Sequence, residues 1–228
     1  MNTMYEILMN IPLFKGASHD QISLFLEKTS LQFKNFKTDD KVISFGENCQ
    51  YVICLLSGRL RLEHPVAHGQ AVVTETIGPG SVVGFGSLFG LNTKFEFDAI
   101  ALQDSGLMYF SKDNYRQLLQ SSQIYLINCL NYLSRKGQRC EEVSNALPGC
   151  NLKCRLAALV ALSTYNNAAD IRIVSRGRDI AEVLCCNREC YAREIELLEQ
   201  TGLVKRIDPQ TLSILSRSQL LQTCNEEN

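Results

Sequence analysis

The stretch "DIAEVLCCNRECYAREIELLEQTGLVKR", residues 179–206, contains two helical patterns separated by a short turn. At about 100° per residue, the second pattern places its apolar side chains on one stripe and its charged side chains on another. The apolar stripe is made of Tyr191, Ile195 and Leu198. The charged stripe is made of Glu189 and Arg193, with Arg188 at its leading edge. Such a helix is held by its apolar side and offers its charged side to a partner.

The residues around this helix predict a helix-turn-helix followed by a hairpin. We expect the first helix over 178–184, the turn at 185–187 and the second helix over 188–200. Asn187 can cap the second helix, because its side chain can accept a hydrogen bond from a free backbone N–H of the first turn. The segment "LVKRIDPQTLSIL", residues 203–215, predicts the hairpin, which would serve as a wing.

The exposed N-terminus of the second helix fits a DNA major groove. The guanidinium of Arg188 matches guanine O6 and N7, and the carboxylate of Glu189 can accept from cytosine N4. Arg193 would reach bases or phosphate one turn further on. The predicted DNA contacts are Arg188, Glu189, Arg193, Asn187, Arg176 and Arg178. The alternative is a solvated charged face, but the spacing of both helices together with the hairpin favours DNA.

Composition limits how such a protein binds DNA and where it works. The net charge of −1 excludes a wholly basic, nucleic-acid-coating surface, so DNA contacts must come from individually placed arginines. The apolar runs are far shorter than the roughly 18 residues of a membrane span, and the N-terminus lacks a signal-peptide pattern. The sequence therefore predicts a soluble cytoplasmic protein without a membrane partner.

The chain contains ten cysteines, which we interpret as free thiols in a reducing compartment. They come without a secretion signal, and two of them, Cys185 and Cys186, are adjacent. No group of them has the spacing of a closed four-ligand metal site, so the metal ligands, if there are any, are unknown from the sequence. The sequence also shows no nucleophile with a positioned base, no phosphate loop and no dinucleotide fingerprint, which argues against an enzyme.

The pattern of apolar residues and glycines changes along the chain and predicts an α+β protein. Residues 1–30 have short amphipathic helical patterns, and residues 31–110 have short β-rich runs punctuated by glycines, which indicate a sandwich or barrel. The predicted division is a β-roll sensor domain at 1–120, a dimerisation helix at 121–147 and a winged helix-turn-helix domain at 148–228.

The long helical segment before the predicted boundary has a heptad-like seam. Its predicted dimer-interface residues are Leu126, Leu130, Leu133, Gly137, Cys140 and Leu147. Such a seam can face a second copy of itself, or the helix can lie on its own barrel. The small residue at Gly137 leaves room for a close partner helix and favours the dimer. At the seam, Cys140 would lie near its symmetry mate, which would permit a redox-dependent crosslink.

The segment "RDIAEVLCCNRECYAREIELLEQTGLV", residues 178–204, resembles the helix-turn-helix of the CRP/FNR transcription regulators. The resemblance covers the whole chain, because sensor barrel, long helix, hinge and winged domain follow in the family's order. It implies a jelly-roll (double-stranded β-helix) sensor of the cyclic-nucleotide-binding type and a homodimer on a palindromic DNA operator, with RNA polymerase as a further candidate partner. One departure is Cys185, where the family commonly has glycine, and we expect a mildly strained backbone there.

The predicted sensor lacks the family's residues for cyclic AMP. In the stretch "GPGSVVGFGSLFGLNTKFEFDAIAL", residues 78–102, Phe85 stands where the family has its ribose-binding Glu, and Phe97 and Asp98 stand where it has its phosphate-binding Arg-Ser pair. Cys140 replaces a hydroxyl residue expected to touch the base. We therefore expect no cyclic AMP binding. The same residues, Phe85, Phe97, Asp98 and Cys140, are the predicted effector pocket, which either takes an apolar effector or is filled by its own side chains.

The resemblance also bears on cofactors. No cysteine precedes Cys49, so we expect no iron-sulfur cluster of the oxygen-sensing branch. The chain is also similar to the haem-dependent branch that responds to nitric oxide and controls hybrid-cluster-protein genes. This similarity implies haem and a role in nitrosative or oxidative stress. The axial-ligand candidates are His64, His68, His19, Met108 or a cysteine. A cysteine-redox or apolar-metabolite sensor that acts through protein contacts is the alternative function.

Overall fold

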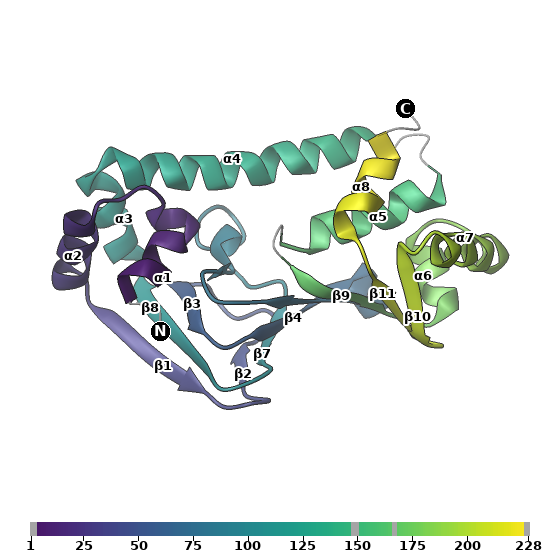
Figure 1. Cartoon of the computed structure of the whole chain (residues 1–228), viewed down its shortest axis with the longest axis horizontal. Coiled ribbons are helices and arrows are strands. Elements are labelled where there is room, and N and C mark those ends of the chain that lie inside the picture. The colour runs from purple at the N-terminus through teal and green to yellow at the C-terminus, as the bar shows by residue number, and fades with distance from the viewer. Residues whose placement is uncertain (1–3, 147–150, 166–167, 226–228) are drawn as a thin grey trace. The chain divides into compact units, whose positions relative to one another are not determined.

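The computed structural model describes residues 4–146, 151–165 and 168–225 (Figure 1). The chain forms two compact units. The first, called the roll unit, comprises Met1–Arg61 and Ile77–Gly137, and the second, called the C-terminal unit, comprises Leu62–Thr76 and Gln138–Asn228. Within the described ranges, no helix is long and apolar enough to cross a membrane.

The helices of the roll unit begin and end where the sequence provides stops and caps. Pro12 stands at the start of the 3-10 helix η1, so it separates two helical segments rather than breaking one. Ser18 caps α2 in a capping box: its Oγ accepts from the Gln21 N–H (3.2 Å), and its own N–H donates to Gln21 Oε1 (2.9 Å). The helices are α1 (Met4–Asn10), η1 (Pro12–Phe14), α2 (His19–Lys28), α3 (Lys112–Ser121) and α4 (Gln123–Ala146), the last of which continues into the C-terminal unit.

The strands of the roll unit are short and antiparallel, as the glycine-punctuated runs predict. One sheet has the order β1-β8-β3-β6, and β2 pairs separately with β7. The strand β1 lies at the start of the β-rich stretch predicted over 31–110, although its residues are mostly exposed. The strands are β1 (Leu31–Phe36), β2 (Lys41–Ile43), β3 (Tyr51–Ser57), β6 (Val82–Val83), β7 (Asp98–Ala101) and β8 (Ser105–Ser111), with η3 at Phe85–Ser87.

The C-terminal unit combines five strands with four short or medium helices. Its strand order is β10-β11-β9-β5-β4, all within one sheet. The helix α8 did not follow from the sequence, because its apolar pattern is short and weak. The elements are β4 (Leu60–Val66), η2 (Ala67–Gly69), β5 (Ala71–Ile77), α5 (Leu152–Ser163), β9 (Ala169–Val174), α6 (Gly177–Val183), α7 (Arg188–Gln200), β10 (Val204–Asp208), β11 (Thr211–Ile214) and α8 (Arg217–Asn225).

The grouping of the chain into units differs from the predicted division in two respects, one of which is that α4 is divided between the units after Gly137. Residues 62–76, placed by sequence in the sensor domain, pack with the C-terminal unit. The reason is that β5 pairs with β9, and this contact between distant parts of the chain has no local sequence signal. The predicted dimerisation helix at 121–147 corresponds to α4, except that Leu147 lies outside the described residues.

Candidate DNA-contact surface and effector region

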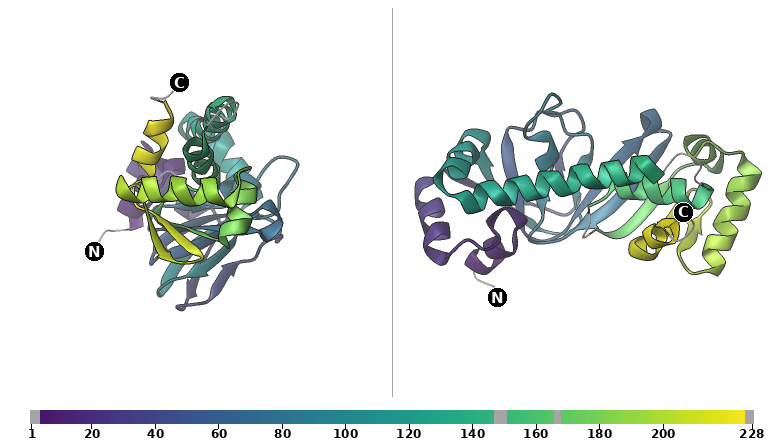
Figure 2. Two further views of the ribbon diagram at one scale, coloured as in Figure 1. Left: turned by 90° about the vertical axis from the view of Figure 1, so that its right-hand side faces the viewer. Right: turned by 90° about the horizontal axis from the view of Figure 1, so that it is seen from above.

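The helices α6 and α7 lie one residue or less from their predicted bounds and are joined by residues 184–187 (Figure 2). Their apolar faces enter the core of the C-terminal unit, where Ile180 and Ile195 are each 1% exposed and Leu198 is 3% exposed. Tyr191 is only partly buried but packs against the same core. The predicted apolar stripe of the second helix therefore anchors it.

Asn187 caps α7 as expected. Its Oδ1 accepts from the Cys190 N–H at 2.8 Å, and its own backbone is extended, so the helix begins sharply at Arg188. This cap fixes the first turn, in which Arg188 and Glu189 are exposed. The first turn therefore presents both side chains on a defined backbone.

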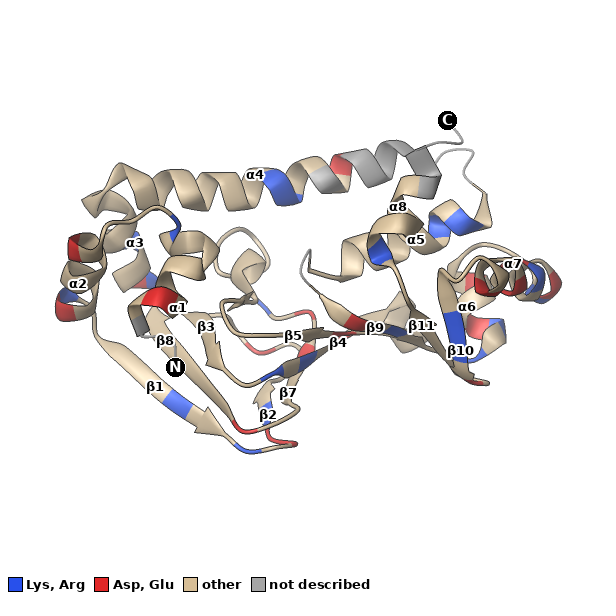
Figure 3. Ribbon diagram, in the orientation of Figure 1, with Lys and Arg blue, Asp and Glu red and all other residues tan. Residues whose placement is uncertain are grey.

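The charged face of α7 is open to a partner. Arg188, Glu189 and Arg193 are exposed, and none of the three side chains has a hydrogen bond or ion pair with another residue in the described part of the chain. Figure 3 shows basic and acidic positions together along α7. A mixed face of this kind can donate to and accept from base edges, whereas it would bind phosphate alone poorly.

The other two predicted DNA-contact arginines lie at the start of α6. Arg176 is its N-cap residue and pairs with Asp179, with 2.6 Å between Nε and Oδ2, although 76% of the Arg176 side chain remains exposed. Arg178 is exposed in the first turn. Arg176 is therefore tied to the helix that carries it, while Arg178 is the more available of the two for a phosphate contact.

The turn between the helices has the backbone strain that the sequence predicts. Cys185 has a φ of 53°, in the left-handed region that favours glycine. Sequence reasoning missed the residue that holds this turn from outside. Arg155 on α5 donates from Nη1 to the carbonyls of Leu184 (2.8 Å) and Cys185 (2.9 Å). The thirty positions that separate Arg155 from Cys185 leave no local pattern from which the clamp could be predicted.

Replacing Cys185 by glycine should stabilise the protein. A left-handed non-glycine residue costs about 1–2 kcal/mol, and the greater freedom of glycine in the unfolded chain offsets about half of that gain. Because the Cys185 side chain is exposed, its removal forfeits little packing. We expect Cys185→Gly to raise the free energy of unfolding by about 0.5–1 kcal/mol, measured as a higher urea midpoint with an unchanged m-value. An unchanged or lower midpoint would show that the turn is unstrained.

The hairpin β10–β11 is fastened to α7 through Arg206. The Arg206 backbone N–H donates to Glu199 Oε1 (2.7 Å), and its Nη2 donates to the Ala192 carbonyl (3.1 Å). This fastening orients the neighbouring Lys205, which is exposed on β10. Lys205 is a further phosphate-contact candidate that the sequence prediction omitted; its signal was its place in the first strand of the predicted wing.

The roll unit fills the region where an effector pocket was predicted. Phe85 and Phe97 are 2% and 6% exposed. The Phe85 ring packs edge-on against Tyr115 and Tyr132, with centroid distances of 5.6 and 5.0 Å, and Phe97 packs against Phe95 at 5.7 Å. Of the two readings left open by the sequence, this packing supports a region filled by its own side chains.

The two polar members of the predicted pocket have other surroundings. Asp98 Oδ1 accepts from the Phe45 N–H (2.8 Å) and pairs with Lys41 Nζ (2.8 Å), so its charge is already satisfied within the roll unit. Cys140 is exposed on α4 and belongs to the C-terminal unit. Within the roll unit, Asp98 is therefore held by Lys41 and the Phe45 backbone.

Gly84 shows how tightly this region is packed. Its φ is 65°, and a Cβ at this position would lie 2.3 Å from Cε1 of Phe95. We expect Gly84→Ala to lower the free energy of unfolding by about 2–4 kcal/mol, from overpacking and backbone strain together. Gly46→Ala is the matched control, because Gly46 has a φ of 82° and nothing within 4 Å of its Cβ position. Equal urea midpoints for the two variants would mean that the aromatic ring yields easily and that the region is loosely packed.

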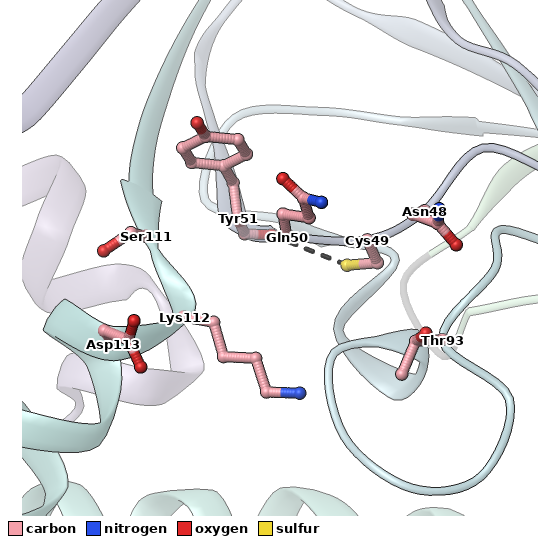
Figure 4. Close-up of a pocket in the computed structure, with 8 residues that line it drawn as sticks. All are labelled: Asn48, Cys49, Gln50, Tyr51, Thr93, Ser111, Lys112 and Asp113. Carbon is pink, nitrogen blue, oxygen red and sulfur yellow. Dashed lines mark hydrogen bonds between the residues drawn. The ribbon is translucent and has the colours of Figure 1, made fainter.

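A separate polar cavity of about 550 Å³ opens on the roll unit (Figure 4). The Cys49 Sγ donates to the Tyr51 carbonyl at 3.6 Å, and burial raises the pKa of this thiol to about 11, so it stays protonated at neutral pH. The Lys112 amine lies over the Phe89 ring, 4.7 Å from its centroid. None of the predicted effector residues contributes to the cavity, which is lined by Asn48, Cys49, Gln50, Tyr51, Thr93, Ser111, Lys112 and Asp113.

Each candidate haem ligand has surroundings of its own. His64 Nε2 lies 3.0 Å from Glu75 Oε1, the His19 ring stacks on Tyr5 at 4.0 Å, Met108 is fully buried, and His68 is exposed in the turn η2. Among the residues that the structure describes, no group of three or more His, Cys, Asp or Glu could hold a metal ion. None of these four side chains lines the cavity of the roll unit.

The helix α4 has one packed face and one apolar exposed face. Tyr125 and Cys129 are buried in the roll unit, and Asn128 Nδ2 donates to the carbonyls of Leu13 (3.2 Å) and Lys15 (2.8 Å). Gly137 and Cys140 of the predicted seam are exposed as well. The exposed face of α4 also carries four large apolar residues that are 39–51% exposed: Leu126, Ile127, Leu130 and Leu133. Of these, only Ile127 was not part of the predicted seam.

Comparison with known proteins agrees with this architecture. Residues 33–122 match the family described as the cyclic nucleotide-binding domain. The catabolite activator protein of Thermus thermophilus is 22% identical, with a TM-score of 0.51 over 95% of this chain and 99% of that chain. The c-di-GMP-responsive global regulator CLP of Xanthomonas campestris is 18% identical, with a TM-score of 0.52 over 87% and 100%. No curated protein sequence matched. Part of the roll unit is thus similar to the cyclic nucleotide-binding domain, and the chain shares the fold of these two regulators.

Proposed function

We propose that this protein is a DNA-binding transcription regulator of the CRP/FNR type and is not an enzyme. In this proposal residues 148–228 contain a winged helix-turn-helix, with α7 as the recognition helix and β10–β11 as the wing. The observation that carries the proposal is the exposed charged face of α7. Its first turn is capped by Asn187. Arg188, Glu189 and, one turn further on, Arg193 are exposed and unpaired among the described residues.

The active form in this proposal is a homodimer on a palindromic operator. The exposed apolar face of α4 supplies the seam, and Leu126, Leu130 and Leu133 would meet the same residues of a second copy. Two recognition helices would then enter successive major grooves, about 34 Å apart. RNA polymerase is a further partner in the proposal, because a regulator bound beside a promoter can recruit it.

Operator binding is proposed to respond to an effector other than cyclic AMP. Phe85 is buried against two tyrosine rings, and Asp98 already pairs with Lys41. A cyclic phosphate placed beside Asp98 would meet a carboxylate whose cation, Lys41, is already paired. Millimolar cyclic AMP should therefore leave both the melting temperature and the operator affinity unchanged.

Selection of binding sequences from a random duplex DNA pool tests the proposal. The expected result is a palindrome whose half-sites lie about one helical turn apart, bound at fixed salt by the reduced full-length protein. If no sequence is enriched under reducing conditions, with or without haem, the DNA-binding proposal fails. That outcome would favour the alternative, a thiol or apolar-metabolite sensor that acts through protein contacts.

The haem proposal needs its own test, because it requires a conformation in which an axial ligand faces a cavity. Visible absorption during titration with haem, before and after nitric oxide, provides it. A saturable Soret band at one haem per chain that shifts with the gas would support a role in nitrosative stress. The spectrum of free haem throughout would remove haem from the proposal and leave the DNA-binding part intact.

A further inference from the structure

The polar cavity of the roll unit is built from segments that are far apart in the sequence. They are residues 48–51 before and at the start of β3, Thr93 in the loop before β7, and residues 111–113 at the junction of β8 and α3. Backbone hydrogen bonds join them: the Cys49 N–H donates to the Thr93 carbonyl (2.7 Å), and the Lys112 N–H donates to the Gln50 carbonyl (3.0 Å). The fold therefore fixes the walls of the cavity, and its volume of about 550 Å³ is typical of small-molecule sites.

Lys112 brings a positive charge into this cavity that no carboxylate of the lining neutralises. Its side chain extends into the open space between the other lining residues (Figure 4). Asp113, the acidic residue of the lining, pairs with Arg116 instead, with 3.1 Å between Oδ1 and Nη1. Within the described ranges Lys112 forms no ion pair, and its amine lies 4.7 Å from the centroid of the Phe89 ring. The face of a ring attracts an ammonium group but does not cancel its charge.

The thiol of Cys49 does not supply the missing negative charge. Its Sγ donates to two backbone carbonyls, at 3.6 and 3.8 Å, and burial raises the pKa of the thiol to about 11. The thiol is therefore uncharged at neutral pH, although Lys112 lies near enough to lower this pKa in part. Glu47, which also acts on the thiol, lies outside the lining, and its Oε2 accepts from the Ser44 N–H at 3.3 Å. The Lys112 ammonium is thus available to an anion from solution.

The rest of the lining offers uncharged groups with free hydrogen-bonding capacity. The side chains of Asn48, Gln50 and Thr93 make no hydrogen bond within the described part of the chain. An amide and a hydroxyl can each donate and accept, which is what a hydroxyl group of a ligand requires of its partners. A ligand with several negative charges would meet the Asp113 carboxylate and, among the described lining residues, no second cation. One ammonium beside several neutral polar groups therefore matches a monoanion that carries hydroxyl groups.

We propose that this cavity binds a small hydroxylated carboxylic acid. The carboxylate accepts from the Lys112 amine in a charge-assisted hydrogen bond, and the hydroxyl groups of the ligand bind the two amides and the Thr93 hydroxyl. All the lining residues belong to the roll unit, and none of them belongs to the DNA-contact surface on α6 and α7. The site is therefore independent of the proposed function, and either can fail while the other holds.

Titration of the isotope-labelled full-length protein with gluconate, followed by the NMR shifts of its backbone amides at constant ionic strength, tests the proposal. Gluconate presents one carboxylate and several hydroxyl groups. Sorbitol is the matched uncharged probe, because it has the same carbon chain with an alcohol in place of the carboxylate. We expect gluconate to cause saturable shifts in the segments that line the cavity, with a dissociation constant in the millimolar range or below. Sorbitol should bind at least about tenfold more weakly.

Two variants assign the contacts. Lys112→Met removes the charge and keeps a long side chain, so it should weaken gluconate binding at least about tenfold. Lys34→Met is the matched control: the Lys34 amine likewise lies over a ring, 4.8 Å from the centroid of Tyr109, but Lys34 does not line the cavity. It should bind gluconate as the parent protein does. Thr93→Val removes one hydroxyl with little change of shape and should weaken binding about threefold.

Several results would overturn the proposal. They are the absence of saturable shifts in the lining segments, equal binding of gluconate and sorbitol, and undiminished gluconate binding by Lys112→Met. Inorganic phosphate, titrated in the same way, is the competing anion: tighter binding of phosphate than of gluconate at these amides would overturn the assignment to a carboxylic acid, and weaker binding supports it. If Lys112→Met does not fold, seen as the loss of amide dispersion, the comparison of gluconate with sorbitol and the Thr93→Val variant decide.

Discussion

Arg188→Ala should weaken binding to the selected operator by roughly 5- to 150-fold, corresponding to about 1–3 kcal/mol for the loss of one bidentate base contact. Arg188 opens α7 with an exposed, unpaired side chain among the described residues, so the loss should fall on DNA contact and not on folding. The preference for guanine at one position of each half-site should relax. A fluorescence-anisotropy titration at fixed salt, repeated on operators changed at that position, measures both effects.

The control for this variant is a matched arginine in the roll unit. Arg116 on α3 is 62% exposed and pairs only with its neighbour in the helix, Asp113. Arg116→Ala removes the same charge from the chain, so it should reproduce any effect of net charge on DNA affinity. If Arg188→Ala and Arg116→Ala lose equal affinity and Arg188→Ala keeps the parent's base preference, Arg188 is not a base contact.

Leu130→Asp should dissociate the proposed dimer. Leu130 is 49% exposed on the apolar face of α4, and a twofold seam would bury two introduced carboxylates against each other. We expect the dimer dissociation constant to rise at least about 100-fold, a change of about 3 kcal/mol. Light scattering after size-exclusion chromatography measures the mass, which should fall from that of a dimer to that of a monomer. The affinity for the palindromic operator should fall as the dimer dissociates.

A second leucine outside α4 provides the comparison. Leu24 on α2 is 46% exposed, so Leu24→Asp makes the same chemical change on a surface without a proposed partner. It should leave the mass and the operator affinity as in the parent protein. A parent protein that is monomeric at micromolar concentration, or a Leu130→Asp variant that remains dimeric, would contradict the seam on α4.

The parts of the site that depend on interactions between residues close in the sequence could be predicted from the sequence. The helices α6 and α7 were predicted to within a residue, because periodic apolar residues and the Asn187 cap act within one or two helical turns. The strain at Cys185 was predicted from the resemblance, because the family commonly has glycine at this position of the turn. The exposed positions of Arg188, Glu189 and Arg193 followed from the same periodicity.

What the sequence could not supply were contacts between distant segments. The clamp of Arg155 on the Cys185 carbonyl and the pairing of β5 with β9 each join residues that no local period connects. The aromatic residues Phe85 and Phe97 illustrate the same limit, because an apolar run describes a lined pocket and a filled core equally well. Only the ring contacts with Tyr115, Tyr132 and Phe95 distinguish the two.

The hairpin formed by β4 and β5, residues 62–76, affects how this protein can be divided. A fragment that begins after the long helix, at about residue 148, would contain α5 to α8 but not β5, and the outer backbone groups of β9 would then face water unpaired. An unprotected strand edge is a template for pairing with other molecules. Such a fragment is therefore expected to self-associate, whereas one that carries residues 62–76 through a designed linker should remain monodisperse. During synthesis the hairpin leaves the ribosome long before β9 does. The edge of β9 can therefore pair with β5 as soon as β9 forms.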